Sequence, residues 1–203
     1  MDTKPQDATA SPVMSPAKLA HVVFRTSNFK PMVNFYKTFL GAHAAYENES
    51  LSFLTYDDEH HRIAIAQVPG TTPKGPATAG MDHVSFTFNT LNDLLLAYKQ
   101  RKAHGILPFW SVNHGPTVSM YYLDPDGNKV ETQVDVFETA EDSKAFLSSP
   151  AFAENPFGVE FKPEDWITRL ENGEHERVLM KRGNVGPRGP ESIPMPSVPA
   201  IEG

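Results

Sequence analysis

The chain has 203 residues, a net charge of −7 at pH 7, 13 phenylalanines and no cysteine. This length allows one domain with a hydrophobic core of its own. The acidic balance, without a local basic patch, argues against nucleic-acid binding, and the lack of cysteine excludes disulfides and thiolate metal ligands. No apolar run approaches the roughly 18 residues of a membrane span, and the polar first residues do not resemble a secretory signal, so we expect a cytoplasmic protein.

The N-terminal part of the chain predicts an arm followed by a repeat. Residues 1–16 are polar and contain proline, and we expect them to form a disordered arm. The run LAHVVF at 19–24 resembles MDHVSF at 81–86. This weak repeat predicts two similar modules, at 17–68 and 79–137.

Each module carries the pattern of one helix followed by strands. Apolar residues recur at helical spacing after both repeated runs: Met32, Phe35, Tyr36, Phe39 and Leu40 in the first module, and Leu91, Leu94, Leu95 and Tyr98 in the second. Gly41 and Gly105 are suited to ending these helices. Alternating segments predict strands at 51–56, 62–68, 118–123 and 129–136. Residues 17–137 therefore predict an α+β domain in which two βαβββ modules form a curved mixed sheet.

His21 and His83 occupy equivalent positions in the two repeated strands. In each strand the histidine lies on the more polar face, and alternation also puts Glu131 on the polar face of the last strand. Two imidazoles and one carboxylate form the set that holds ferrous iron while leaving coordination positions open. When the modules are aligned, Glu131 corresponds to Ala64, so the first module offers no fourth ligand.

Residues 138–181 extend the paired domain and predict helices. Thr139 is suited to cap a short helix through Phe146, and Pro163 is suited to the first turn of a second helix. We expect this extension to fold over the domain or over a partner subunit of a homo-oligomer. The Pro/Gly-rich tail at 182–203 is expected to be extended.

The run VNHGPTVSMYYLDPDGNKVE at 112–131 gathers the largest number of candidate site residues. It places His114, Tyr121 and Glu131 around an Asp-Pro-Asp-Gly turn, which we interpret only as a turn that starts the following strand in register. An imidazole and a phenol near a carboxylate can bind a substrate hydroxyl and move its proton.

This arrangement resembles the vicinal oxygen chelate superfamily of glyoxalases, bleomycin resistance proteins and dioxygenases. Within it, the chain is most similar to the extradiol catechol dioxygenases of the 2,3-dihydroxybiphenyl dioxygenase type. The resemblance covers about residues 18–137, and its most specific positions are His114, Met120, Tyr121, Asp124, Pro125, Gly127 and Glu131. The His-His run in DDEHHRIAIA matches the family's distal catalytic histidine, for which His61 is the better match and His60 the alternative.

The resemblance implies an Fe(II)-dependent enzyme, with Mn(II) as an alternative ion, that cleaves a catechol-type diol with O2. The implied metal ligands are His21, His83 and Glu131. The implied catalytic residues are His61, His114 and Tyr121. The candidate substrate-binding residues are His114, Tyr121, Phe109, Trp110 and Phe137.

Two other functions use the same sequence features in different ways. A metal-dependent isomerase, epimerase or lyase of the same fold would act through an enediolate and use the same triad. Such an enzyme has no need of His61, His114 and Tyr121 together. A non-catalytic small-molecule binding protein of the bleomycin resistance kind would lack the triad. The sequence predicts no nucleic-acid or membrane partner.

Overall fold

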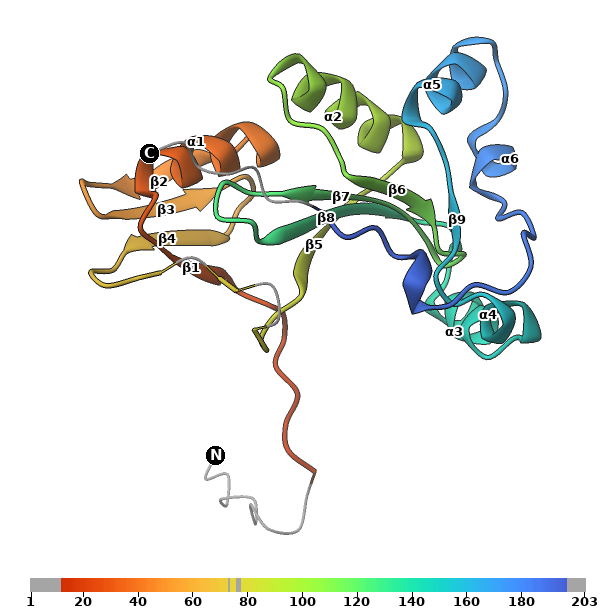
Figure 1. The fold of residues 1–203 in the computed structure, drawn as a ribbon, viewed down its shortest axis with the longest axis horizontal. Coiled ribbons are helices and arrows are strands. Elements are labelled where there is room, and N and C mark those ends of the chain that lie inside the picture. Colours follow the sequence, from red (N-terminus) through yellow and green to blue (C-terminus); the bar gives the residue numbers. More distant parts are fainter. Residues whose placement is uncertain (1–11, 73, 76–77, 197–203) are drawn as a thin grey trace, which may run out of the picture.

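The first module consists of one helix and four strands, whose arrangement is shown in Figure 1. Its elements are β1 (Val22–Thr26), α1 (Phe29–Leu40), β2 (His43–Glu47), β3 (Leu51–Thr55) and β4 (Ile63–Gln67). The computed structural model describes residues 12–72, 74–75 and 78–196, so most of the predicted arm and the last seven residues of the predicted tail lie outside the described residues.

The second module repeats the order of the first. Its elements are β5 (His83–Phe88), α2 (Leu91–Ala103), β6 (Trp110–Asn113), β7 (Thr117–Leu123) and β8 (Lys129–Asp135). The predicted βαβββ modules are therefore confirmed. In each module the first and last strands pair in parallel and the other neighbours pair antiparallel.

The strands are divided between two mixed sheets, with the orders β1-β4-β3-β2 and β5-β8-β7-β6-β9. The registers confirm the predicted alignment of the modules. Ala64 lies opposite Val23, and Glu131 lies opposite Ser85. Val23 and Ser85 each follow the histidine of their strand by two residues, so Ala64 and Glu131 are structurally equivalent.

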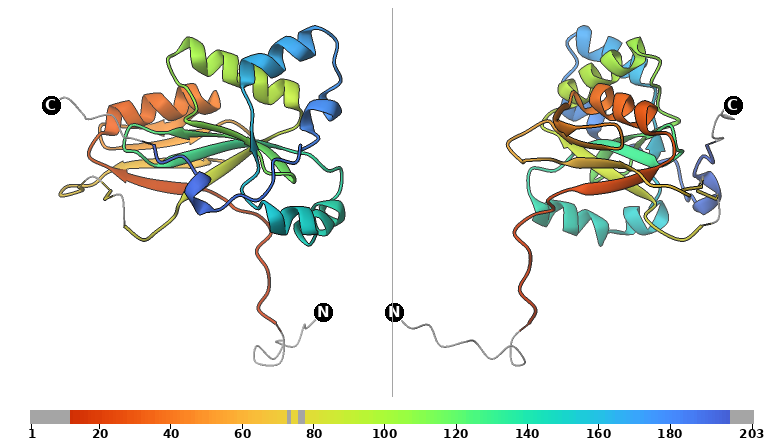
Figure 2. Two further views of the ribbon diagram at one scale, coloured as in Figure 1. Left: turned by 45° about the vertical axis from the view of Figure 1, so that its right-hand side comes forward. Right: turned by 90° about the vertical axis from the view of Figure 1, so that its left-hand side faces the viewer.

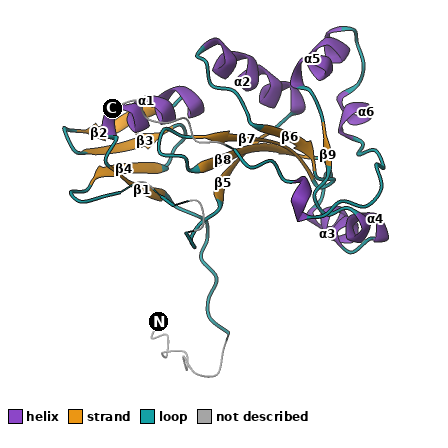
Figure 3. Cartoon of the chain, in the orientation of Figure 1, coloured by secondary structure: helices purple, strands orange, loops and turns teal. Residues whose placement is uncertain are grey.

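Helices α1 and α2 lie on the same side of the sheets (Figures 1 and 3). The apolar stripe predicted for α1 is buried, and Met32 and Tyr36 are fully inaccessible to solvent. The helix ends at Gly41, which adopts a left-handed φ of 62° that favours glycine. The amide of Asp93 in α2 donates to the hydroxyl of Thr90, which caps that helix at 3.1 Å.

Polar contacts also join the two modules. The buried Tyr36 hydroxyl of α1 donates to Asp124 at 3.0 Å, and Asp124 in turn accepts from the amide of Asn128 at 2.8 Å. The Asp-Pro-Asp-Gly segment is therefore a turn that also fastens the first module to the second. Arg101 of α2 is only 3% exposed and donates to the Phe39 carbonyl at 2.8 Å. These contacts hold α1 and α2 in fixed positions behind the sheets.

The C-terminal extension contributes both helices and a strand. Its elements are α3 (Ala140–Leu147), α4 (Pro150–Glu154), β9 (Val159–Glu160), α5 (Pro163–Glu171), α6 (Glu176–Met180) and the short 3-10 helix η1 (Pro190–Ser192). The two predicted helix starts are confirmed, since Thr139 caps α3 and Pro163 begins α5.

The extension wraps one end of the second module (Figure 2). β9 pairs with β6 and becomes the fifth strand of the second sheet. β6 leads into the loop 114–116, called the His114 loop, which joins it to β7. The extension therefore reaches the part of the fold that carries His114. None of the helices in the described part of the chain has the length and hydrophobicity needed to span a membrane.

Candidate active site

Glu131 lies at the centre of a group of polar side chains on the second sheet. Its neighbours in register are Ser85 of β5 and Tyr121 of β7. The residue is 4% exposed, and its Oε2 lies 3.1 Å from Nε2 of His83. Burial opposes ionisation, but hydrogen bonds from His83, Ser119 and other neighbours outweigh it and lower the pKa of Glu131 to about 2. Glu131 is therefore a carboxylate at neutral pH.

His83 is oriented from both sides of its ring. Its Nε2 faces Glu131, and its Nδ1 lies 2.8 Å from Oδ2 of Asp82. Asp82 in turn accepts from Lys129 at 2.9 Å. The hydrogen bond to Glu131 is the main cause that raises the pKa of His83 to about 9, against the opposite effect of burial. A histidine that binds a metal through one ring nitrogen commonly donates the N–H of its other ring nitrogen to a carboxylate, which fixes the orientation of the ring.

Tyr121 and His114 form a second pair beside Glu131. The Tyr121 hydroxyl lies 3.0 Å from Nε2 of His114. Burial, followed by the charge of Glu131, raises the pKa of Tyr121, so the phenol keeps its proton. Burial also lowers the pKa of His114. A neutral imidazole with a free Nε2 can accept the phenolic proton, so the pair can take up and pass on a proton.

Aromatic side chains line one side of this pair. The Trp110 ring stacks on Tyr121 with centroids 5.0 Å apart, and Phe109 lies 6.3 Å from the same ring. Ile193 of the C-terminal segment packs against this cluster. Together they form an apolar wall next to the Tyr121 hydroxyl. The contact between Ile193 and this aromatic cluster could not be predicted from the sequence. The residues lie more than 70 positions apart, and no sequence pattern relates them.

His21 and His61 form a group on the first module. Their ring centroids are 4.4 Å apart, and His61 also stacks on Phe53 at 4.7 Å. Burial, followed by the nearby charges of His21 and His60, lowers the pKa of His61. The side chain of His60 is 69% exposed. The packing thus favours His61 over His60 as the histidine that accompanies His21.

The structure brings together only part of the predicted metal-binding set. His83 and Glu131 are in contact, whereas His21 contacts the histidines of the first module. Over residues 12–72, 74–75 and 78–196, no three His, Asp or Glu side chains are grouped closely enough to hold an ion. The assignment of all three residues as ligands therefore stays a prediction.

The donor chemistry of the predicted ligands fits a divalent cation. His83 presents a ring nitrogen and Glu131 a carboxylate oxygen to the same point, 3.1 Å apart. In this arrangement the proton between the two atoms belongs to His83, and a cation bound by both atoms would replace it. The equivalent position in the first module is occupied by Ala64, which is 2% exposed and carries no donor. The His83 and Glu131 donors therefore suit a metal that keeps open coordination positions.

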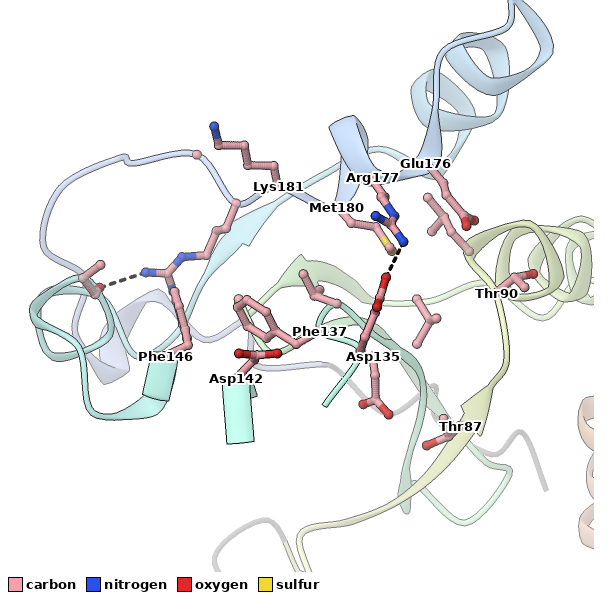
Figure 4. A pocket seen from close by; sticks show the side chains of 18 of the residues that line it. Thr87, Thr90, Asp135, Phe137, Asp142, Phe146, Glu176, Arg177, Met180 and Lys181 are labelled. Carbon is pink, nitrogen blue, oxygen red and sulfur yellow. Dashed lines mark hydrogen bonds and ion pairs between the residues drawn. The ribbon is translucent and has the colours of Figure 1, made fainter. Parts of the chain in front are cut away.

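Several polar residues that support these groups were not predicted from the sequence. Asp82 orients His83, and the neighbouring hydroxyls of Ser85 and Ser119 contribute to the lowered pKa of Glu131. Ser85 could have been found, because strand alternation places it on the same face as His83. Phe137 has a different environment from Trp110: it lies 5.7 Å from Phe146 and lines a cavity of about 840 Å³ (Figure 4). Its role in substrate binding stays a prediction.

The sequence matches a known family over the paired modules. The family model described as the Glyoxalase/Bleomycin resistance protein/Dioxygenase superfamily matches residues 18–132, which is more than half of the chain. The chain therefore belongs to this superfamily. A crystal structure of a candidate glyoxalase from Bacillus halodurans has the same fold, with a TM-score of 0.50 and 15% identity over 58% of this chain and 96% of that chain.

Two curated relatives come from Rhodococcus globerulus. Biphenyl-2,3-diol 1,2-dioxygenase 2 is 47% identical over 147 residues, which cover 72% of this chain and 77% of the relative. Biphenyl-2,3-diol 1,2-dioxygenase 3 is 44% identical over 167 residues, which cover 81% of this chain and 88% of the relative. Both names describe cleavage of the ring bond next to the diol, so the predicted class, an extradiol dioxygenase, is confirmed.

Proposed function

We propose that the chain is an Fe(II)-dependent extradiol dioxygenase that cleaves biphenyl-2,3-diol or a related catechol with O2. The observation that carries the proposal is the contact between His83 and Glu131, with the Tyr121–His114 hydrogen bond on the adjoining strand. This arrangement places two candidate metal donors beside a pair of groups that can move a proton. The names of the two Rhodococcus relatives support the diol as the substrate class.

His21, His83 and Glu131 would hold the ion, with Fe(II) as the proposed metal and Mn(II) as the alternative. The donors are two neutral imidazoles and one carboxylate, the facial set of non-heme iron oxygenases. When bound, the ion lowers the pKa of the diol hydroxyls and brings the diol and O2 to one place. Asp82 fixes the orientation of the His83 ring, which keeps Nε2 directed at Glu131.

Tyr121 and His114 would receive the proton that the diol loses. The diol hydroxyl lies within reach of the Tyr121 oxygen in this proposal, and His114 Nε2 accepts the proton through the 3.0 Å contact. Trp110 and Phe109, which pack beside Tyr121, would provide apolar contacts for the ring that is not cleaved. The apolar wall also keeps water away from the reacting ring.

His61 would act from the first module. It lies beside His21, and its lowered pKa leaves the imidazole neutral at neutral pH. A neutral imidazole can accept a proton as a base and then return it as an acid in the later proton transfers. The ring bond next to the diol breaks, and both atoms of O2 enter the product, one in a carboxylate and one in a carbonyl group.

The remaining features of the proposal concern the whole protein. We propose a cytoplasmic homo-oligomer whose partners are the diol and O2, without nucleic acid or membrane. The net charge of −7 agrees with the absence of a nucleic-acid partner. Light scattering after size exclusion tests the oligomer, and a monomer at all concentrations would contradict it.

The metal ligands are tested by iron content under anaerobic reconstitution. We expect about one Fe(II) per chain in the parent, and loss of iron and oxygen uptake in His21→Ala and His83→Ala. His43→Ala is the matched control, because His43 is an exposed histidine on β2 that contacts neither group. Stoichiometric iron in both ligand variants would refute the triad. Iron without diol cleavage by the parent would refute the activity.

A further inference from the structure

The C-terminal extension makes direct contacts with the His114 loop and with Asn113 at its start. The side chain of Asn113, which is 2% exposed, donates to the Met180 carbonyl at the end of α6 over 2.7 Å. The Oδ1 atom of the same amide accepts from the amide of Gly115 at 2.9 Å. Both hydrogen-bonding ends of Asn113 are therefore used to fix the residues around His114. Met180 lies on the wall of the cavity shown in Figure 4, next to this loop.

Arg182 makes the most direct contact between the extension and the His114 backbone. Its Nη1 donates to the His114 carbonyl at 2.9 Å and to the Asn155 carbonyl at 2.8 Å. Its Nη2 donates to the Ala151 carbonyl at 2.8 Å. The guanidinium also lies over the Phe146 ring, 5.0 Å from its centroid. One side chain thus joins the His114 loop to α3 and α4.

These partners are unusual for a charged group. All three hydrogen-bond acceptors are backbone carbonyls, and no carboxylate forms an ion pair with Arg182 in the described part of the chain. Only the planar fork of an arginine can reach several carbonyls in fixed directions at once. The contacts of Arg182 therefore fix the positions of three backbone carbonyls relative to one another.

Gly158 shows how closely the extension approaches the same loop. It has a φ of +93°, and a Cβ built on it would lie 2.4 Å from the Asn113 carbonyl oxygen and 2.9 Å from His114 Cα. Asn155 holds this turn, since its Oδ1 accepts from the amides of Phe157 and Gly158 at 3.1 and 2.8 Å. The backbone of the extension is therefore packed directly against the residue that carries the imidazole.

We infer that Arg182 is a positioning residue that sets the location of the His114 imidazole relative to Tyr121. The inference rests on the proposed function, because it assigns the extension a role in that reaction. It makes the segment 150–182 a support of the active site that acts through the backbone of Asn113 and His114. A displacement of the His114 loop lengthens the 3.0 Å contact with Tyr121 and slows proton transfer.

The test compares Arg182→Met and Arg182→Lys with the control Arg169→Met. Arg169 belongs to the same extension, but its bonds are to Glu174 at 2.6 Å on the surface. We expect Arg182→Met to lower kcat at least about tenfold with little change in KM or iron content. Lysine cannot reach all three carbonyls, so Arg182→Lys should restore only part of the rate. The control should retain the parent rate.

A double-mutant cycle separates positioning from general damage to the fold. If Arg182 acts through His114, Arg182→Met should cause no further loss of kcat in a His114→Ala background. Added guanidinium should partly restore the rate of Arg182→Met but not that of the double variant. Equal losses in both backgrounds, or no loss in the parent background, would overturn the inference.

A measurement without turnover distinguishes this inference from the proposed function. The nitrogen chemical shifts of the His114 ring report its tautomer and hydrogen bonding in the metal-free protein. Arg182→Met should change these shifts, and Arg169→Met should leave them as in the parent. Unchanged shifts in Arg182→Met would overturn the inference even if the parent cleaves diols. If Arg182→Met changes the shifts but the parent cleaves no diol, the inference about His114 stands and the proposed reaction is rejected.

Discussion

The exchange of Tyr121 for phenylalanine removes one hydroxyl from the candidate active site and little else. The ring is 8% exposed and stacks on Trp110 with centroids 5.0 Å apart, and phenylalanine preserves this packing. The lost hydroxyl lies 3.0 Å from His114 Nε2. Because Tyr121 is not a metal ligand in this proposal, the variant should retain iron and bind the diol.

The expected magnitude follows from that one contact. A buried group left without its hydrogen-bond partner costs about 1–3 kcal/mol. If the contact is made in the transition state, this cost lowers kcat roughly 5- to 150-fold, since about 1.4 kcal/mol corresponds to a factor of ten. KM should change much less, because the contact acts on the proton that moves and not on the ring that binds.

Oxygen uptake with saturating Fe(II) and diol measures this effect, with iron content determined on the same samples. Tyr122→Phe is the matched control: Tyr122 is the next residue of β7, is fully buried, and its hydroxyl lies 3.5 Å from the sulfur of Met120. This variant should keep the parent kcat per folded enzyme. The role assigned to the Tyr121 hydroxyl would be refuted if the kcat of Tyr121→Phe equals that of the parent. It would also be refuted if Tyr121→Phe and Tyr122→Phe lose the same fraction of kcat.

Three further variants test other parts of the structure. Glu131→Gln replaces the only anionic ligand with an amide, so iron content and ring cleavage should both be lost, and a variant with full iron would contradict the ligand assignment. Leu94→Ala truncates a side chain with no exposed surface in α2 and should lower the free energy of unfolding by about 2–5 kcal/mol in urea titrations; no change would contradict its place in the core. The pKa of Glu164 is lowered to about 2 by hydrogen bonds with Lys102 and Tyr98, so its contribution to stability is present above its ordinary value of 4.5 and is lost as the pH falls toward 2. Glu164→Gln should therefore lose less stability than the parent over that interval, and equal acid sensitivity would contradict this contribution.

The repeat and the helix faces could be predicted from the sequence because they are periodic. The apolar stripes of α1 and α2 are buried as their spacing indicates, and the strand alternation places His83 and Glu131 on one face. The caps of the helices were also visible, since Gly41 and Thr139 are residue types with specific roles at helix ends. These features depend on residues that are close in the sequence.

Features that depend on distant residues could not be predicted in the same way. β9 has two residues, which is too short for an alternating pattern, yet it completes the second sheet. The buried Arg101 and the carbonyl contacts of Arg182 show no sequence signal, because an arginine in isolation predicts an exposed side chain. Asp124 was predicted as part of a turn, and only the fold shows that Tyr36 reaches it from the other module. The candidate site residues were therefore predicted from the motif, and the residues that support them in the fold were not.

The activity itself is tested most directly by labelled dioxygen. The Fe(II)-loaded chain is given biphenyl-2,3-diol under isotopically labelled O2, and the product is analysed by mass spectrometry and by its yellow colour. We expect a ring-opened product that contains both labelled oxygen atoms, formed by the parent and by His43→Ala but not by His83→Ala. A chain that holds iron at the His83–Glu131 pair and yields no ring-opened product, or a product with a single labelled atom, would contradict extradiol cleavage at this site.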